Sequence, residues 1–162
     1  MATPTYDLLA STTLTSSVTS VTFSSIDQSY GDLILVMNTT GNSSSNTYLQ
    51  FNGDTSSIYS YLSMYGNGSS SGSIGDSNVN RLYIQGGLGL SGGFQAIYNL
   101  QDYSATNKHK TVLGRVSRAS QWVTADTGRW ASTSAIISIL IGAAGSYTYP
   151  IGSTFNLYGV AK

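Results

Sequence analysis

The side chains that could carry acid–base or nucleophilic chemistry are few in this sequence. His109 is the single histidine and lies between Lys108 and Lys110. No strand-to-helix elbow marks a nucleophilic serine, and there is no cysteine. All seven carboxylates are aspartates, and six of them lie beside Gly, Ser or Asn or next to a turn, where aspartate is favoured for backbone reasons. The sequence therefore predicts no catalytic residue and no enzymatic activity.

Oxygen ligands for a metal ion occur at two places, but neither completes a known binding loop. Segments 52–54 (Asn-Gly-Asp) and 75–78 (Gly-Asp-Ser-Asn) have the small oxygen ligands that Ca²⁺ prefers. Asn-Gly dipeptides, however, are primarily hairpin signals. Without cysteine, zinc sites built on thiolates are excluded. The glycine-rich segment 86–93 neither opens a helix nor precedes a lysine, as a phosphate-binding loop would. We expect no metal and no cofactor, with calcium at the two turns as the alternative.

Cationic and aromatic side chains in the second half of the chain form the one candidate binding site. Residues 108–162 hold six cations against one aspartate, a net charge of +5, whereas residues 1–107 have a net charge of −5. Either the two halves interleave in one domain and their charges mix, or the particle is dipolar and docks electrostatically. The candidate partner-binding residues are Lys108, Lys110, Arg115, Arg118, Arg129, Trp122 and Trp130.

The partner predicted for this site is a protein with an acidic surface. Nucleic-acid binding uses the same residue types. The sequence pI near 6.5 and the lack of an RNA-binding signature favour a protein instead. Our docking hypothesis is that Arg115, Arg118 and Arg129 face the acidic side of that partner.

The composition predicts one all-β domain. A chain of 162 residues fits a single domain with a sizeable core. Only 9% of the residues are charged, against about 25% in a typical protein, and the absence of glutamate argues against long helices. Because 40% of the residues are hydrophobic, the many serines and glycines do not indicate disorder. The start, MATPTYDLL, lacks a signal-peptide pattern, and no apolar run approaches the length of a membrane span, so we expect synthesis in a cytoplasm without membrane insertion.

The pattern of apolar residues predicts a two-sheet antiparallel β-sandwich. Leu33–Met37 and Ile136–Ile141 are continuous apolar runs, which is typical of strands covered on both faces. Phe94–Leu100 alternates as a strand with one buried face. We interpret Tyr65–Asn80 as a long surface loop and expect a hairpin around residues 125–127. Nine to eleven short strands separated by turns favour a jelly-roll-like sandwich spanning residues 1–162.

Several stretches resemble a group of small β-sandwich structural proteins of tailed bacteriophages and prophages. The segment DYSATNKHKTVLGR fits that group's pattern of a polar turn followed by Lys-Thr. The other resembling stretches cover most of the chain and are residues 6–38, 48–68, 127–142 and 151–162. The resemblance implies a virion structural component with a β-sandwich fold, and it supplies no catalytic residue.

Length narrows the kind of virion component that we expect. A tail fibre ordinarily needs an anchoring segment and a shaft, whereas this chain has room for one domain. A capsid decoration (cement) protein, which binds the outside of the major capsid protein shell and stabilises it, fits best. The resemblance then implies a homo-oligomer, trimers included, on the virion surface. Such a protein is made in the host cytoplasm and directly contacts neither a membrane nor nucleic acid.

The alternative is a receptor-binding or carbohydrate-binding tail fibre or tail tip protein. In that case Tyr65–Asn80, Gly86–Gly93 and the nearby tyrosines would contact a host surface glycan, because tyrosine gives contact area at low entropic cost. Tyr59 and Tyr61 could instead be the buried face of a strand. A third interpretation, a glycan hydrolase, would need a deep cleft with two carboxylates.

Overall fold

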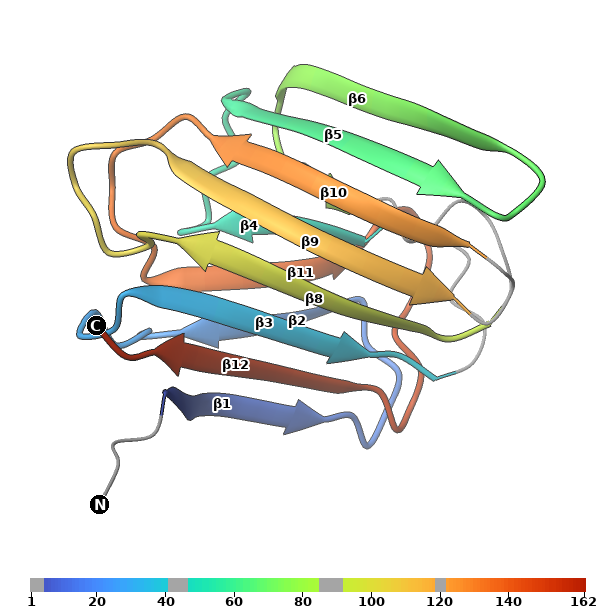
Figure 1. Ribbon diagram of the computed structural model, residues 1–162. Helices are drawn as coiled ribbons and strands as arrows, with labels where there is room; N and C mark the ends of the chain where they lie inside the picture. The colour runs from blue at the N-terminus through green and yellow to red at the C-terminus, as the bar shows by residue number, and fades with distance from the viewer. Residues whose placement is uncertain (1–4, 41–46, 85–91, 119–121) are drawn as a thin grey trace.

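The computed structural model describes residues 5–40, 47–84, 92–118 and 122–162 and consists of two antiparallel β-sheets (Figure 1). The larger sheet has eight strands, in the order β1 (Tyr6–Thr13), β12 (Thr154–Val160), β3 (Asp32–Asn38), β8 (Phe94–Gln101), β9 (Lys110–Arg118), β10 (Val123–Trp130), β5 (Tyr59–Gly66) and β6 (Ser71–Val79). The smaller sheet has four, in the order β2 (Ser20–Ser24), β11 (Ser138–Ala143), β4 (Thr47–Phe51) and β7 (Leu82–Ile84).

This arrangement confirms the predicted two-sheet β-sandwich, with twelve strands rather than nine to eleven. The four-stranded sheet lies behind the eight-stranded sheet in the view of Figure 1. From β1 to β5 the chain alternates between the two sheets, as jelly-roll-like sandwiches do. Among the residues that the structure describes there is no helix long and apolar enough to cross a membrane.

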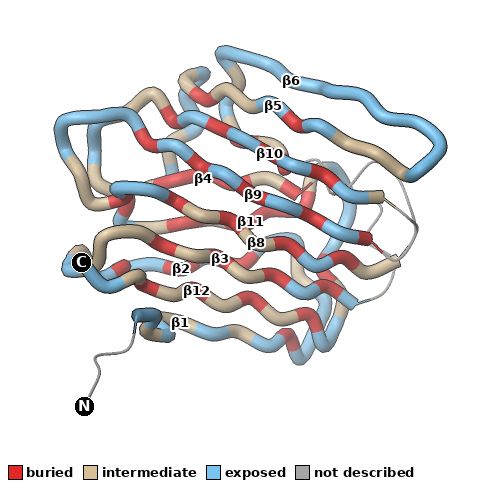
Figure 2. Tube along the Cα trace, in the orientation of Figure 1, coloured by how far each residue is buried: buried red, intermediate tan, exposed pale blue. Residues whose placement is uncertain are grey.

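The core lies between the sheets, because buried residues alternate with more exposed ones along most of the strands (Figure 2). In β9 every second residue from Lys110 to Arg118 is buried and the residues between them are exposed. An aromatic cluster fills one end of the core, where the ring of Trp130 lies 5.6 Å from Phe51 and 6.3 Å from Tyr59. The tyrosine hydroxyl there donates to the carbonyl oxygen of Asp54 at 3.0 Å, so its polar atom is satisfied.

The prediction that two apolar runs are covered on both faces is wrong. In β3, Leu33, Leu35 and Met37 are fully buried between the sheets, but the residues between them are only half-buried. In the second run Ile136 is buried whereas Ile137 is 55% exposed, and β11 begins one residue later. Each of these two strands has a single covered face, because the described strands form two layers and no third described layer packs on their outer sides.

Two segments predicted as turns or loops are strands. The expected loop between residues 65 and 80 contains β6, which pairs with β5 along its whole length. The expected hairpin around residues 125–127 is the middle of β10, which pairs with both β9 and β5. Asp126 is consequently no turn residue: its side chain points into the core and accepts a hydrogen bond from the hydroxyl of Tyr98.

Candidate functional site

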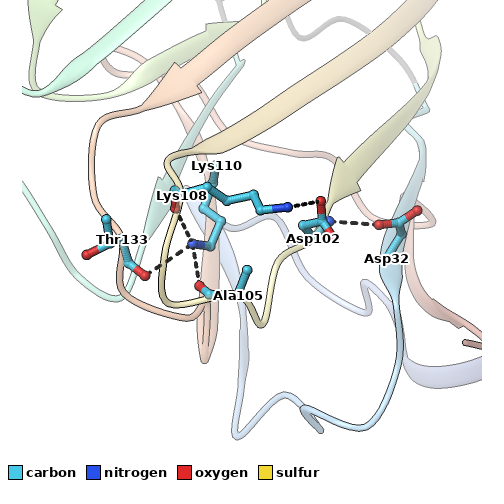
Figure 3. A network of polar contacts seen from close by, with 6 residues as sticks. All are labelled: Asp32, Asp102, Ala105, Lys108, Lys110 and Thr133. Atoms are coloured by element: carbon cyan, nitrogen blue, oxygen red, sulfur yellow. Dashed lines mark hydrogen bonds and ion pairs between the residues drawn. The ribbon is translucent and has the colours of Figure 1, made fainter.

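The predicted cationic site does not form one patch, because Lys110 is a core residue. Its side chain is 1% exposed, and its ammonium donates to the carbonyl oxygens of Ala105 at 2.7 Å, Lys108 at 3.0 Å and Thr133 at 3.3 Å (Figure 3). Burial lowers the pKa of Lys110. The three carbonyl contacts tie the turn between β8 and β9 to the segment after β10, so this lysine has a structural role.

Lys108 lies beside this buried lysine but belongs to the surface. Its ammonium pairs with a carboxylate oxygen of Asp102 at 2.9 Å, and both side chains are more than half exposed. The backbone N–H of Asp102 donates in turn to Asp32 at 2.7 Å, which links the turn to β3 (Figure 3). An exposed pair of this kind contributes about 0–1 kcal/mol to stability. Its cation is already neutralised within the chain, which makes it a poor anchor for a partner.

Three further predicted residues are turned inward or packed against neighbours. Trp130 is buried, and its indole N–H donates to the Asp54 carboxylate at 2.8 Å. Arg118 is 8% exposed, with its guanidinium 5.8 Å from the ring centre of Phe94, and burial lowers its pKa. Trp122 is half-buried against a tyrosine ring of β5. Arg118 therefore does not lie on the same face as the other two arginines of the docking hypothesis.

The alternation of side chains along β9 is the signal in the sequence that distinguishes inward-facing from exposed cations. Lys110 and Arg118 are an even number of residues from Val112 and Val116, which are buried, so all four side chains point the same way. Arg115 has the opposite parity and is exposed. Charge and composition alone do not reveal the direction of a side chain.

Arg115 and Arg129 remain exposed on what we call the large-sheet face, the side of the eight-stranded sheet turned away from the four-stranded one. This face carries six of the ten exposed large apolar side chains among the described residues. The six are Tyr6, Leu8, Leu62, Met64, Leu113 and Val123. The continuous apolar run of β3 is the one signal of this face in the sequence, and it was interpreted as a strand covered on both faces.

The strand register places these side chains in rows that cross seven strands. One row runs from β5 to β1 and consists of Leu62, Thr127, Leu113, Asn99, Ile34, Tyr158 and Leu8. The neighbouring row consists of Met64, Ala125, Arg115, Ile97, Val36, Asn156 and Ser11. Side chains directly opposite on neighbouring strands touch one another, so each row is a continuous surface.

Two adjoining hollows lie in the centre of the large-sheet face. The larger has a volume of about 560 Å³ and is lined mainly by apolar side chains of β3, β8, β9 and β10, among them Ile34, Val36 and Leu113. The second, of about 390 Å³, lies towards Val123 and shares Ile97 with the first. Arg115 also lines both hollows and is their one charged residue.

The predicted turn at residues 52–54 forms, and its polar atoms are used within the chain. Asn52 and Gly53 both have positive φ, as the Asn-Gly signal predicts, and Asp54 N–H closes the turn on the carbonyl of Phe51 at 2.9 Å. The Asp54 carboxylate accepts bonds from Ser56 and from the indole described above. In the part of the chain that the structure describes, no three His, Cys, Asp or Glu side chains gather where they could hold a metal ion.

Comparison with known proteins gives distant structural neighbours only. No protein-family model matches the chain, and no curated protein matches it. Among solved structures it is similar to galectin LEC-6 of Caenorhabditis elegans, with 10% identity, 100% of this chain and 99% of that chain covered, and a TM-score of 0.43. It is also similar to a variant of alginate lyase Aly36B in complex with alginate tetrasaccharide, with 11% identity, coverage of 90% and 72%, and a TM-score of 0.36. Neither likeness transfers a ligand or an activity to this chain.

Proposed function

We propose that the chain is a non-catalytic structural protein of a bacteriophage virion, a capsid decoration protein that docks on the major capsid protein shell through its large-sheet face. The observation that carries the proposal is the apolar character of this face, which combines exposed side chains such as Leu113 and Met64 with two apolar hollows. Contiguous exposed apolar surface on a soluble protein marks a site of contact with another macromolecule.

The sequence of β3 supports a protein partner. Its five-residue apolar run has the pattern of a strand with both faces covered, yet Ile34 and Val36 line an open hollow. A third layer of protein on the large-sheet face would cover these side chains and complete the pattern. We therefore place the centre of the interface over β3, β8 and β9.

The charges on the large-sheet face define the chemistry of the partner. Arg115 lies among the apolar side chains at the centre, and Arg129 lies on β10 near the edge of the apolar region. Asp32 is the one carboxylate on this face among the described strands. A complementary partner surface has an acidic side chain opposite Arg115 within its apolar centre and another near its rim opposite Arg129; charge pairs at the rim raise the association rate more than the final affinity.

The location on a phage capsid rests on the resemblance of the segments named above to virion proteins. A compact, nearly uncharged sandwich suits a module added to a finished shell. The neighbouring subunits of a shell are related by symmetry, and homo-oligomers, trimers included, match that symmetry. Docking that bridges subunits would stabilise the shell against the pressure of packaged DNA.

Co-sedimentation with purified capsids tests this function. The wild-type chain should bind in numbers comparable to the major capsid protein, and Leu113→Asp should bind at least about tenfold more weakly, because it buries an unpaired charge in the interface. Ile151→Asp is the matched control: Ile151 is 62% exposed but lies in the turn before β12, off the large-sheet face. The proposal fails if capsids do not bind the wild-type chain, or if the two variants behave alike.

A further inference from the structure

A second surface lies on the opposite side of the molecule and goes beyond the proposed docking function. We call it the small-sheet face, the side of the four-stranded sheet turned away from the larger one. Tyr48 of β4 projects from it and lies directly opposite Tyr83 of β7 and Gly142 of β11. A methyl group on Gly142 would come within 2.2 Å of the Tyr48 ring, so the ring packs tightly against the backbone at that position.

Arg81 covers the exposed side of this tyrosine ring. Its guanidinium carbon lies 4.4 Å from the ring centre of Tyr48 and 5.8 Å from that of Tyr83, and the two rings meet edge to face at 6.4 Å. Stacking on aromatic rings leaves the in-plane N–H groups of a guanidinium free to donate. A third ring, that of Tyr61, contacts Tyr83 at 5.6 Å and connects the cluster to the larger sheet.

Neighbouring amides fix the orientation of this guanidinium. The Nε–H of Arg81 donates to the side-chain oxygen of Asn80 at 3.1 Å. Gln50, which is buried, donates to the backbone carbonyl of Asn80 at 2.9 Å and so holds the residue before the arginine in place. A ring on one side and an amide at its inner edge thus hold the guanidinium in position. Because the side chain is already ordered, it loses little conformational entropy when a ligand binds.

The outer edge of the same guanidinium has no partner in the described residues. The two terminal nitrogens of Arg81 make no hydrogen bond there, and no carboxylate lies within ion-pair distance of them. Two parallel N–H groups in one plane match the two oxygens of a carboxylate. Arg81, which immediately precedes β7, is the one cation beside the described strands of the small-sheet face, and these strands themselves carry no Lys or Arg; a polyphosphate chain would require several cations.

From this geometry we propose that Arg81, Asn80, Tyr48 and Tyr83 bind the carboxylate of an acidic sugar in a glycan. The guanidinium accepts the carboxylate in the bidentate mode. Tyrosine hydroxyls and the Asn80 amide are uncharged hydrogen-bonding groups, which suit sugar hydroxyls, and Thr22 on the same face adds another hydroxyl. A ligand with one carboxylate among many hydroxyl groups fits this surface better than a strongly charged one.

Titration calorimetry with oligogalacturonate and with sialyllactose tests the site on the intact chain. Arg81→Gln should weaken binding on the order of tenfold or more, and Arg81→Lys should also weaken it, because lysine keeps the charge but not the planar pair of donors. Lys108→Gln removes an exposed positive charge elsewhere and should leave binding unchanged. Methyl-esterified oligogalacturonate, which keeps the sugars and loses the charge, should not bind. Equal melting temperatures of the variants exclude unfolding as the cause.

Three results would overturn this inference. The first is that neither acidic sugar binds, and the second is that wild type and Arg81→Gln bind the sugars equally well. The third is that poly-aspartate binds as tightly as the acidic sugars and also depends on Arg81, which would assign the site to an acidic peptide. Because the site lies on the small-sheet face, these results are independent of capsid docking through the large-sheet face.

Discussion

Replacing Gly114 by alanine tests the packing of the sandwich most sharply. Gly114 lies in the middle of β9 and faces the core, where the ring of Tyr98 packs directly over it. An alanine methyl group would come within 2.1 Å of two ring carbons of Tyr98. That ring is fully buried, and its hydroxyl donates to Asp126, so it cannot move without breaking a hydrogen bond to a buried carboxylate.

The magnitude follows from the two consequences of a displaced ring. Overpacking a core costs about 1–3 kcal/mol, and losing a hydrogen bond to a charged group costs about 1.5–3 kcal/mol. Replacing glycine by alanine offsets about 0.4–1 kcal/mol of this cost, because alanine reduces the conformational entropy of the unfolded chain. Gly114→Ala should therefore lower the free energy of unfolding by about 2–5 kcal/mol, a large share of the roughly 5–15 kcal/mol of a typical domain.

Equilibrium unfolding in urea, followed by the fluorescence of buried Trp130, measures this difference. Gly66→Ala is the matched control, because the nearest atom to its added methyl group is 3.7 Å away, an ordinary contact. It should be neutral or stabilising by up to about 1 kcal/mol. Tyr98→Phe removes the hydroxyl without displacing the ring and should cost about 1.5–3 kcal/mol. A Gly114→Ala protein within about 0.5 kcal/mol of wild type would refute the packing described here.

Four further variants probe the polar residues of the chain. Lys110→Met leaves three backbone carbonyls without their donor and should lower the free energy of unfolding by about 1–3 kcal/mol in urea titrations; an unchanged midpoint would contradict its structural role. Burial opposes ionisation of Asp54, but hydrogen bonds from its own turn and from the indole outweigh it and lower its pKa. Its carboxylate therefore stabilises the fold above the unfolded-state pKa of about 3.9, and this stability is lost as the pH falls through the lower folded-state pKa. Melting temperatures of Asp54→Asn should fall less steeply below about pH 4 than those of wild type; equal slopes would count against the assignment. Arg118→Ser should lower the melting temperature because it empties a packed position over Phe94. Arg115→Ser should leave the melting temperature unchanged and reduce capsid binding only at low salt. If instead Arg115→Ser lowered the melting temperature and Arg118→Ser reduced capsid binding, Arg115 would be the packing residue and Arg118 the docking residue.

The sequence was sufficient for the architecture because strand alternation is a local signal. The expected strand Phe94–Leu100 differs from β8 by one residue, and the Asn-Gly turn at 52–53 formed where its dipeptide predicted. β6 was missed because it lies at the edge of a sheet with nearly every side chain exposed, so its Gly and Ser residues need no apolar pattern. Its stability comes from backbone pairing to β5, which composition does not reveal.

The candidate site was harder to predict because it depends on direction and on long-range partners. Asp126 looked like a turn residue between Thr and Ala, but pairing on both sides of β10 holds it in an extended strand. The Arg81 cluster joins β4, β7 and β11, and no local pattern brings Tyr48 together with Gly142. Such contacts between distant segments become visible only after the strand order is known.

Counting the copies of this chain in purified virions tests the central claim most directly. Quantitative mass spectrometry, with the major capsid protein as the internal reference, gives the ratio of the two proteins in intact particles. A capsid decoration protein that docks through its large-sheet face should be present in stoichiometric proportion to the shell protein, and Leu113→Asp should reduce that ratio where Ile151→Asp does not. A few copies per particle, or none, would contradict the account.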